Sequence, residues 1–463
     1  MISPRVSDEP LEVAVLSETQ SLCPECLRPV RAVRFSYGQD VYLSKTCPNH
    51  GEFRTVLWRG GPSYASWTRP KEPWQALNPA MAVEKGCPFD CGLCPEHRQQ
   101  TCTALIEVTQ RCGMRCAFCF AGSSADAGPD PDLRLIRGWY ESARSNQAHC
   151  NIQLSGGEPT VRDDLPEIVA LGRSIGFEFI QLNTNGLRLA AEPAYVEKLK
   201  EAGLASVFLQ FDGTTEDVHR TLRKRPLLEA KKAAIRNCRA NEIGVVLVPT
   251  VVPGVNDHEL GEIVQFAMEN LPTVRGVHFQ PVSYFGRYST VPTDAGRITI
   301  PEVIRGLELQ TEGMVSTADF APPGCENALC SFHGTFVLMP DGGLKSFSRQ
   351  AESCSCGQPK AEDGAAQTRR FVARQWSQPE QRTCCDTHES LSLGYWDVIL
   401  ERARTHTLAI SGMAFQDAWN IDLERLKDCC IHVVARDGRL IPFCAYNLTS
   451  SSGQALYSRG DRP

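Results

Sequence analysis

The chain has 463 residues, which is enough for two or three domains, one of them with a large core. Its composition, 42% hydrophobic and 22% charged, is ordinary for a globular protein. The net charge is −6, from 48 basic and 54 acidic residues. The chain therefore has no overall positive charge to attract nucleic acid, and we do not expect nucleic acid as a partner.

The longest apolar runs, such as 245–252, are far shorter than the roughly 20 residues of a membrane helix. The first residues, MISPRVSDEPLEV, lack the apolar stretch of a secretory signal, so we expect a cytoplasmic protein. The 21 cysteines are the unusual feature. In a cytosolic chain of this length, cysteines in closely spaced groups indicate metal binding rather than disulfides.

Residues 1–103 are expected to form a cysteine-rich metal-binding module. Cys23 and Cys26 form one C-x2-C pair, and Cys47 and His50 follow about 20 residues later. This spacing predicts a mononuclear zinc or iron site with four protein ligands, in which another cysteine could replace His50. Because four protein ligands leave no open position, the site is predicted to be structural.

Two cysteine triads share the spacing C-x3-C-x2-C. The first consists of Cys87, Cys91 and Cys94, and the second of Cys112, Cys116 and Cys119. Only the second follows an apolar strand pattern, and barrel active sites lie where strands end. The first triad is therefore predicted to hold an auxiliary cluster, with Cys102 as a candidate fourth ligand.

Residues 104–285 alternate between apolar strand patterns and amphipathic helix patterns. Strands are expected at 104–109, 151–155, 177–183, 206–211, 245–251 and 277–281, and helices at 134–146, 164–175, 193–202, 227–241 and 258–270. The pattern predicts an α/β fold with a partial, TIM-like (β/α)6 barrel built on a parallel sheet.

Three thiolates at the spacing of Cys112, Cys116 and Cys119 can hold three corners of a 4Fe–4S cluster and leave the fourth iron open. A zinc knuckle would have the same spacing. With an aromatic residue on each side of Cys119 and the sequence GGEPT at 156–160, the stretch resembles the radical S-adenosylmethionine (radical SAM) superfamily. The resemblance implies that these cysteines are catalytic.

The same resemblance implies which residues contact the S-adenosylmethionine. Paired glycines at the end of the second strand let a backbone approach a ligand closely, and Asn-Thr-Asn-Gly ends the third strand. A glycine-rich turn common to many α/β domains remains the alternative. The implied contacts are Phe118, Gly156, Gly157, Glu158, Pro159, Asn183 and Asn185.

Residues 286–463 are expected to form a second metal-rich region. Hairpins are predicted to turn at 341–343 and 437–438. A polar insertion near 350–390, with Cys354, Cys356, Cys384 and Cys385, is expected to be peripheral. Ligands of a further cluster are proposed to be Cys325, Cys330, Cys429 and Cys444, with a buried thiol or zinc site as the alternative.

The combination of CPEC, CPFDCGLCPEH, the radical triad, ISGMAFQ and the ending CIHVV-x-x-DGR-x-IPFC-x-YN is similar to the tetraether lipid synthase family. Relatives in that family are also described as pterin methyltransferases. The chain departs from the family at Gln100, where relatives often have histidine, and at Cys430, which is often not a cysteine. The resemblance implies one or two auxiliary iron–sulfur clusters beside the radical SAM cluster and the mononuclear metal.

The resemblance also implies that a 5′-deoxyadenosyl radical removes hydrogen from an unactivated carbon, for carbon–carbon bond formation on a lipid alkyl chain. One alternative is C-methylation of a pterin or another small heterocycle, and another is a non-catalytic zinc-binding scaffold. A lipid substrate would call for peripheral membrane contact, although no amphipathic stretch establishes it. The radical reaction would need an electron donor such as ferredoxin or flavodoxin.

Overall fold

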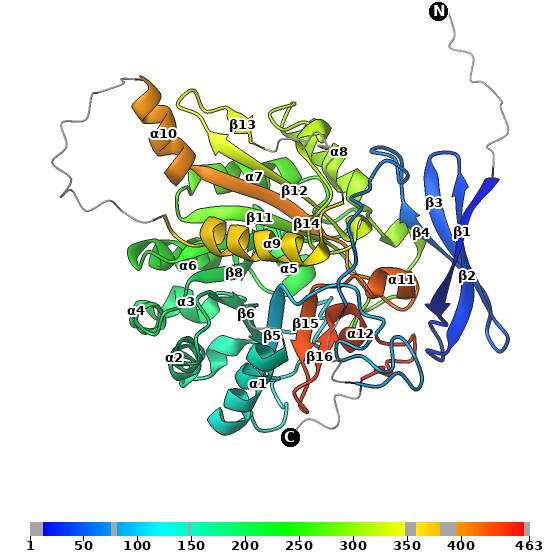
Figure 1. Cartoon of the computed structure of the whole chain (residues 1–463). Coiled ribbons are helices and arrows are strands. Elements are labelled where there is room, and N and C mark those ends of the chain that lie inside the picture. The colour runs from blue at the N-terminus through cyan, green and yellow to red at the C-terminus, as the bar shows by residue number, and fades with distance from the viewer. Residues whose placement is uncertain (1–12, 76–80, 147–149, 348–357, 380–394, 458–463) are drawn as a thin grey trace, which may run out of the picture.

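Two sheets contain the strands of the computed structural model, which describes residues 13–75, 81–146, 150–347, 358–379 and 395–457 (Figure 1). The first sheet is N-terminal and antiparallel, in the order β1-β2-β3-β4. Its strands are β1 (Val13–Leu22), β2 (Pro29–Tyr37), β3 (Asp40–Cys47) and β4 (Gly51–Trp58). It stands at one side of the larger body of the protein (Figure 1).

The centre of the second sheet consists of six neighbouring parallel strands, in the order β11-β9-β8-β7-β6-β5. These strands are β5 (Thr103–Thr109), β6 (Asn151–Gly156), β7 (Ile180–Thr184), β8 (Ser206–Gln210), β9 (Gly244–Val248) and β11 (Val274–Pro281), and β10 (Thr250–Val251) pairs with β11. The partial (β/α)6 barrel predicted from the sequence is confirmed.

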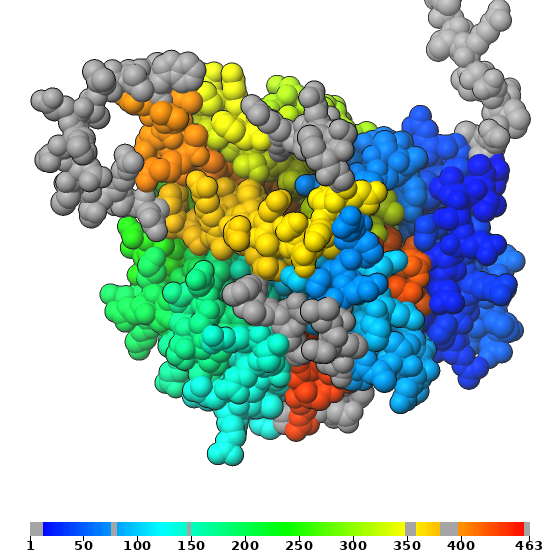
Figure 2. All heavy atoms as spheres, in the orientation of Figure 1, coloured from blue at the N-terminus to red at the C-terminus, as the bar shows by residue number. Residues whose placement is uncertain are grey.

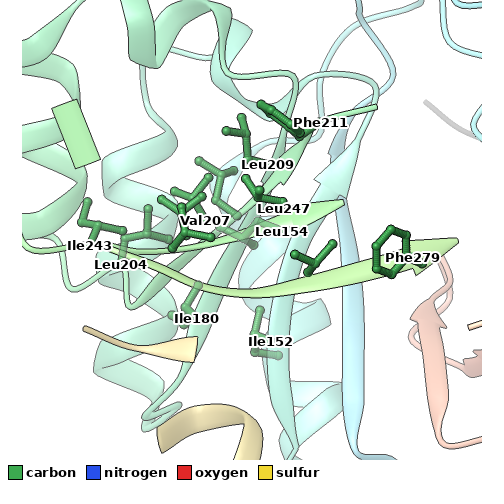
Figure 3. Packing of buried hydrophobic residues seen from close by; sticks show 14 of the residues in the cluster. Ile152, Leu154, Ile180, Leu204, Val207, Leu209, Phe211, Ile243, Leu247 and Phe279 are labelled. Carbon is green, nitrogen blue, oxygen red and sulfur yellow. The ribbon is translucent and has the colours of Figure 1, made fainter. Parts of the chain in front are cut away.

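The helices of the barrel region lie between these strands in the chain. They are α1 (Leu133–Asn146), α2 (Leu165–Ile175), α3 (Leu187–Ala191), α4 (Pro193–Glu201), α5 (Glu216–Arg223), α6 (Leu228–Ala240) and α7 (Leu260–Glu269). Within each strand, alternate side chains face the helices. Ile152, Ile180, Val207 and Leu247 belong to this apolar layer, which forms the main core (Figure 3).

Three strands differ from their predicted bounds by more than one residue or by a break. The strand expected at 277–281 already begins at Val274. The other two differences have backbone causes. The strand expected at 177–183 begins only at Ile180, because Gly176 ends α2 in the left-handed conformation (φ 108°) and Phe177 still bonds back to the helix. The strand expected at 245–251 is interrupted at Pro249, which has no N–H to give to the sheet. Both differences are local backbone effects.

The C-terminal residues extend the barrel sheet at both edges. At one edge β14 (Thr407–Met413) is parallel to β11, and β12 (Ser331–Leu338) and β13 (Leu344–Ser346) follow as an antiparallel hairpin. At the other edge β15 (Ile431–Val434) is parallel to β5 and pairs with β16 (Leu440–Pro442). The remaining helices are α8 (Ile300–Gln310), α9 (Ala361–Trp376), α10 (Tyr395–Thr405), α11 (Leu423–Leu426) and α12 (Phe443–Asn447).

The insertion expected to be peripheral contains α9, which crosses the face of the molecule shown in Figure 2 and lines the main cavity. The expectation of a peripheral segment was wrong for α9. Although the helix contains several glutamines and arginines, its apolar residues recur at helical spacing and give it a face that can pack against the protein. Cys354, Cys356, Cys384 and Cys385 lie outside the described residues. Among the described helices, none has the length and apolar character needed to cross a bilayer.

Candidate active site and metal centres

The loop that leaves the C-terminal end of β5 carries Cys112, Cys116 and Cys119. Its ends are fixed by backbone hydrogen bonds. The Cys112 N–H donates to the carbonyl of Ser124 at 2.9 Å, and Cys119 and Arg287 exchange two bonds of 2.9 and 3.0 Å. The fold therefore presents the three thiols from a loop that is fixed at both ends.

Two arginines support the middle of the loop. The Arg287 side chain donates to the carbonyl of Cys116 at 3.2 Å, and Arg223 donates to the carbonyl of Phe118 at 3.4 Å. Arg223 also forms a buried ion pair with Asp212, with 2.6 Å between Nε and Oδ2. Burial alone would raise the pKa of Asp212, but the attraction of Arg223 holds it below its usual value. Burial would lower the pKa of Arg223, but the charge of Asp212 raises it, so the guanidinium stays charged where it holds the loop.

The electrostatics and spacing of the triad suit a cluster. Burial, followed by the charges of Glu158, Cys116 and Cys119, raises the pKa of Cys112 to about 11, so a bound cation is needed to stabilise the thiolate. Among the described residues, the triad is not one of the sets whose ligand atoms all lie within 4.8 Å of one another. A single tetrahedral ion would bring the sulfurs to about 3.8 Å.

Gly156 and Gly157 let the end of β6 approach the start of the cysteine loop. A Cβ on Gly156, which has φ +128°, would lie 2.0 Å from the carbonyl oxygen of Thr109. A Cβ on Gly157 would lie 2.3 Å from the carbonyl oxygen of Arg111. The sequence predicted that the glycines make room for a ligand, and the structure shows that they also make room for the protein's own backbone.

The Glu158 carboxylate links the ends of β6 and β7. Its Oε1 accepts hydrogen bonds from the hydroxyls of Thr160 (2.7 Å) and Thr184 (2.6 Å), and its Oε2 accepts from the N–H of Asn185 (2.7 Å). Both oxygens are therefore used inside the protein. Pro159 starts a buried 3-10 turn behind the carboxylate. The role of Glu158 seen here is to position the neighbouring loops.

One cavity of about 750 Å3 runs along the interior of the barrel. Its wall contains Cys112, Cys116 and Cys119, which are expected to be catalytic. It also contains most of the residues expected to contact S-adenosylmethionine: Phe118, Gly156, Gly157, Glu158, Asn183 and Asn185. The Asn183 Nδ2 lies 3.4 Å from the hydroxyl of Ser155, while its Oδ1 has no hydrogen-bond partner. The structure thus brings together side chains that the sequence placed on separate strand ends.

A row of amide side chains, which the sequence analysis missed, lines the same cavity. Gln153, Gln181, Gln210 and Gln280 occupy alternate strand positions that face inward from β6, β7, β8 and β11. The Gln153 Nε2 donates to the Oε1 of Gln181 at 2.9 Å, and the Oε1 of Gln210 has no partner. The signal was present in the sequence, since each of these apolar strands contains one inward glutamine.

Aromatic residues complete the wall at the α9 end. Trp376 of α9 lies 5.5 Å from the ring of Phe208 and 6.2 Å from that of His278. Burial lowers the pKa of His278 to about 4, and its Nδ1 lies 2.9 Å from the hydroxyl of Ser411. His278 is therefore a neutral imidazole at neutral pH. The cavity offers both flat aromatic faces and hydrogen-bonding groups.

The N-terminal set consists of Cys23, Cys26, Cys47 and His50, whose ligand atoms all lie within 4.8 Å of one another. The His50 Nδ1 is 3.5 Å from the sulfur of Cys23 and 3.4 Å from that of Cys47. The backbone N–H of Asn49 is the main cause that lowers the pKa of Cys47 to about 6. This compact set fits one tetrahedral ion.

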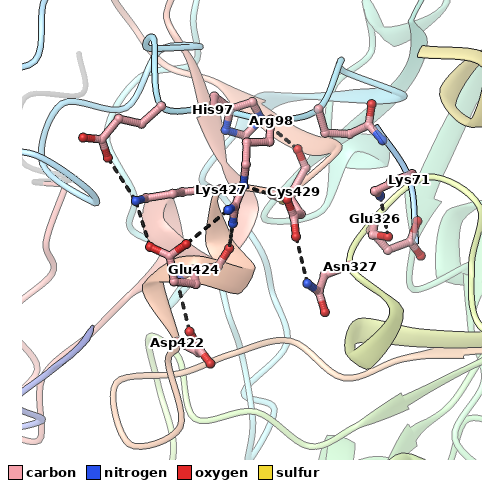
Figure 4. A network of polar contacts seen from close by, with 12 residues as sticks. Lys71, His97, Arg98, Glu326, Asn327, Asp422, Glu424, Lys427 and Cys429 are labelled. Atoms are coloured by element: carbon pink, nitrogen blue, oxygen red, sulfur yellow. Dashed lines mark hydrogen bonds and ion pairs between the residues drawn. The ribbon is translucent and has the colours of Figure 1, made fainter. Parts of the chain in front are cut away.

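Cys87, Cys91 and Cys94 surround a small separate cavity that His97 and Lys427 also line. The Nε2 of His97 lies 2.9 Å from the carbonyl oxygen of Cys429, which links this loop to the C-terminal region (Figure 4). Cys330 and Cys444 lie near Cys429. Burial, followed by Cys444 and then Cys330, raises the pKa of Cys429 well above its usual value.

The structure places Cys102 and Cys325 in a different set from those expected. Their sulfurs form a disulfide, and all three ligand atoms of Cys102, Cys325 and Cys430 lie within 4.8 Å. Two predictions therefore differ from the arrangement found. Cys102 was expected to be the fourth ligand of the first triad. Cys325 was expected to join Cys330, Cys429 and Cys444. The reason is topological: β15 pairs with β5, which brings Cys430 beside Cys102.

Two family models match parts of the chain, and one relative matches most of it. Residues 106–267 match the family model of the radical SAM superfamily, and residues 15–59 match the HMPTM N-terminal zinc ribbon domain. The chain is 36% identical to the 7,8-dihydro-6-hydroxymethylpterin dimethyltransferase of Methanocaldococcus jannaschii, over 93% of both chains.

More distant matches cover only part of the chain. The probable GTP 3′,8-cyclase of Methanothermobacter marburgensis is 33% identical, over 37% of this chain and 56% of that protein. Among solved structures, Streptococcus suis SuiB bound to S-adenosylmethionine matches 47% of this chain and 48% of its own, with a TM-score of 0.36 and 16% identity.

Proposed function

Because this chain belongs to the radical SAM family of the 7,8-dihydro-6-hydroxymethylpterin dimethyltransferase, we propose that it methylates a carbon atom of a pterin-like heterocycle. The chain is a radical SAM enzyme, which implies a 4Fe–4S cluster and S-adenosylmethionine. When bound, these cofactors supply a 5′-deoxyadenosyl radical that can remove hydrogen from carbon. The lipid synthase reading that the sequence favoured has less support than its pterin alternative.

The residues at the triad fit the cofactors that the family implies. Three thiols stand on a fixed loop, and beside them lies a cavity with unpartnered acceptors such as Asn183 Oδ1. We propose that Cys112, Cys116 and Cys119 hold the cluster. In this proposal Arg223 and Arg287 keep the loop in place, and Glu158 holds the glycine turn against the end of β7.

The observation that carries the substrate proposal is the amide row of Gln153, Gln181, Gln210 and Gln280. A pterin presents several N–H donors and ring acceptors, and amides can match both kinds. The ring faces of Phe208 and Trp376 offer stacking partners for a flat heterocycle. An alkyl chain would leave the Oε1 of Gln210 buried without a partner, at a cost of roughly 1–3 kcal/mol.

The test is an anaerobic assay with the reduced, reconstituted enzyme and S-adenosylmethionine. One reaction receives a 6-hydroxymethyl-7,8-dihydropterin and the other an isoprenoid diether lipid, and mass spectrometry follows both products. We expect the pterin to gain the mass of one or two methyl groups while 5′-deoxyadenosine accumulates. An unchanged pterin together with a coupled lipid would overturn the proposal. A parallel reaction with ferredoxin or flavodoxin as the reductant, compared with one that contains a chemical reductant, tests the proposed electron donor.

A further inference from the structure

A third cysteine set consists of Cys102, Cys325 and Cys430. The three residues come from distant parts of the chain, and all are buried. Cys102 and Cys430 directly precede β5 and β15, and Cys325 lies in the loop before β12. Their sulfurs lie within 4.8 Å of one another, a compactness shared among the described residues only with the N-terminal set.

The backbone holds these three positions firmly. The N–H of Cys102 donates to the carbonyl of Cys430 at 2.8 Å, immediately before the parallel pairing of β5 with β15. The Lys71 ammonium and the Gln99 amide both donate to the carbonyl of Cys325. The loop that contains Cys325 is thus anchored to the same N-terminal segment that leads into β5.

A second link joins the loop of Cys325 to the turn that contains Cys430. The Asn327 side chain donates to the Asp428 carboxylate at 2.8 Å, and Lys71 also donates to the backbone carbonyl of Glu326 at 2.9 Å (Figure 4). Such fixed backbone positions are typical of a site whose ligands are arranged before metal binds.

The disulfide between Cys102 and Cys325 does not explain the third thiol. Their Cα atoms are 7.5 Å apart, beyond the roughly 4.4–6.8 Å usual for disulfides. Cys430 completes a three-sulfur set, and the Oε2 of Glu326 lies 3.6 Å from its sulfur.

The set also opens onto the active-site cavity, whose wall includes Cys102, Cys430 and Glu326. The catalytic triad lies at the other end of β5, a strand of 7 residues, which corresponds to roughly 20 Å of chain. A substrate between the two ends of the cavity could therefore contact both sites.

We propose that the thiolates of Cys102, Cys325 and Cys430 hold one thiophilic metal ion, iron or zinc, whose fourth position faces the cavity. A three-ligand site with an open position is the arrangement that lets a metal bind an external ligand. The open position takes a nitrogen or oxygen donor of the substrate, and this last step rests on the function proposed above. When a dithiol reduces the disulfide, it becomes a cyclic disulfide itself. The two restored thiols and the free thiol of Cys430 then lose their three protons to the medium as the ion binds.

The experiment measures iron, zinc and acid-labile sulfide in enzyme purified without oxygen and treated with dithiothreitol. It compares the native chain with C430S and with C238S, a matched control because Cys238 is a buried thiol of α6 outside every set. We expect C430S to lose one metal ion per chain with unchanged sulfide, and C238S to lose none. Equal metal in C430S and the native chain, or a loss of sulfide together with iron, overturns the proposal of a mononuclear site.

A second measurement tests the open position. In cobalt-substituted protein, imidazole is expected to shift the thiolate-to-cobalt absorption of the native chain but not that of C430S, since the N-terminal site already has four protein ligands. A native spectrum that imidazole leaves unchanged overturns the open position. Neither readout uses turnover, so a failure of pterin methylation would leave both results standing.

Discussion

Replacing Gly157 by alanine tests whether close backbone packing positions the catalytic cysteines. The new Cβ would lie 2.3 Å from the carbonyl oxygen of Arg111, and ordinary contact begins near 3.4 Å, so the backbone must move by about 1 Å. Arg111 directly precedes Cys112, so the movement reaches a proposed cluster ligand. Overpacking of this kind costs about 1–3 kcal/mol of stability. A misplacement of about 1 Å can lower the rate of a positioned reaction by about 100-fold.

The assay for G157A combines thermal unfolding, iron and sulfide content, and the rate of 5′-deoxyadenosine formation. We expect a lower melting temperature and a rate that falls by more than iron loss alone explains. G138A is the matched control, because Gly138 lies inside α1 and a Cβ there meets nothing within 4 Å. Alanine in a helix interior should leave the rate unchanged and add up to about 1 kcal/mol of stability. A G157A enzyme with native stability and rate would refute the packing argument.

Three further substitutions test other parts of the site. D212N removes the partner of buried Arg223, so we expect unfolding to become easier by roughly 3–5 kcal/mol, measured by denaturant titration. Q210L removes an unpartnered acceptor from the cavity wall, and the Michaelis constant for the pterin should rise while uncoupled S-adenosylmethionine cleavage stays native. His278 has its pKa lowered to about 4, so the unfolded chain binds more protons between pH 6.5 and 4, and stability should fall as the pH drops through this range. H278Q should lose that pH dependence in melting curves, and an unaltered profile would contradict the assignment.

The sequence predicted the barrel well because its signals are local. Each strand combines apolar residues that face the helices with alternate positions that face inward, and helical patterns separate the strands. The proposed cluster ligands could be named for the same reason, since Cys112, Cys116 and Cys119 lie within eight residues of one loop. The position of Pro249 even contained the signal for the break between β9 and β10 that the strand prediction overlooked.

The ligand sets of the other cysteines could not be predicted, because they depend on contacts between distant segments. Cys102 and Cys430 meet only because β15 pairs in parallel with β5, a pairing that neither segment reveals alone. The role of α9 was hidden for a related reason. Its glutamines and arginines suggest an exposed segment, whereas Phe371 and Trp376 reach the cavity once the helix lies across it.

The cavity itself limits the substrates that the enzyme can take. About 750 Å3 is within the range of roughly 300–1,000 Å3 typical of small-molecule sites, so S-adenosylmethionine and one small ring system fill much of it. Two acceptors on its wall, Asn183 Oδ1 and Gln210 Oε1, have no partner within the protein. Sites built to hydrogen-bond a substrate reject analogues that lack the matching group by about 10⁴-fold or more. Because Asn183 is assigned to S-adenosylmethionine, Gln210 Oε1 is the acceptor left for the substrate. A long alkyl chain has no donor for this oxygen, so under the function proposed above it should discriminate against lipid.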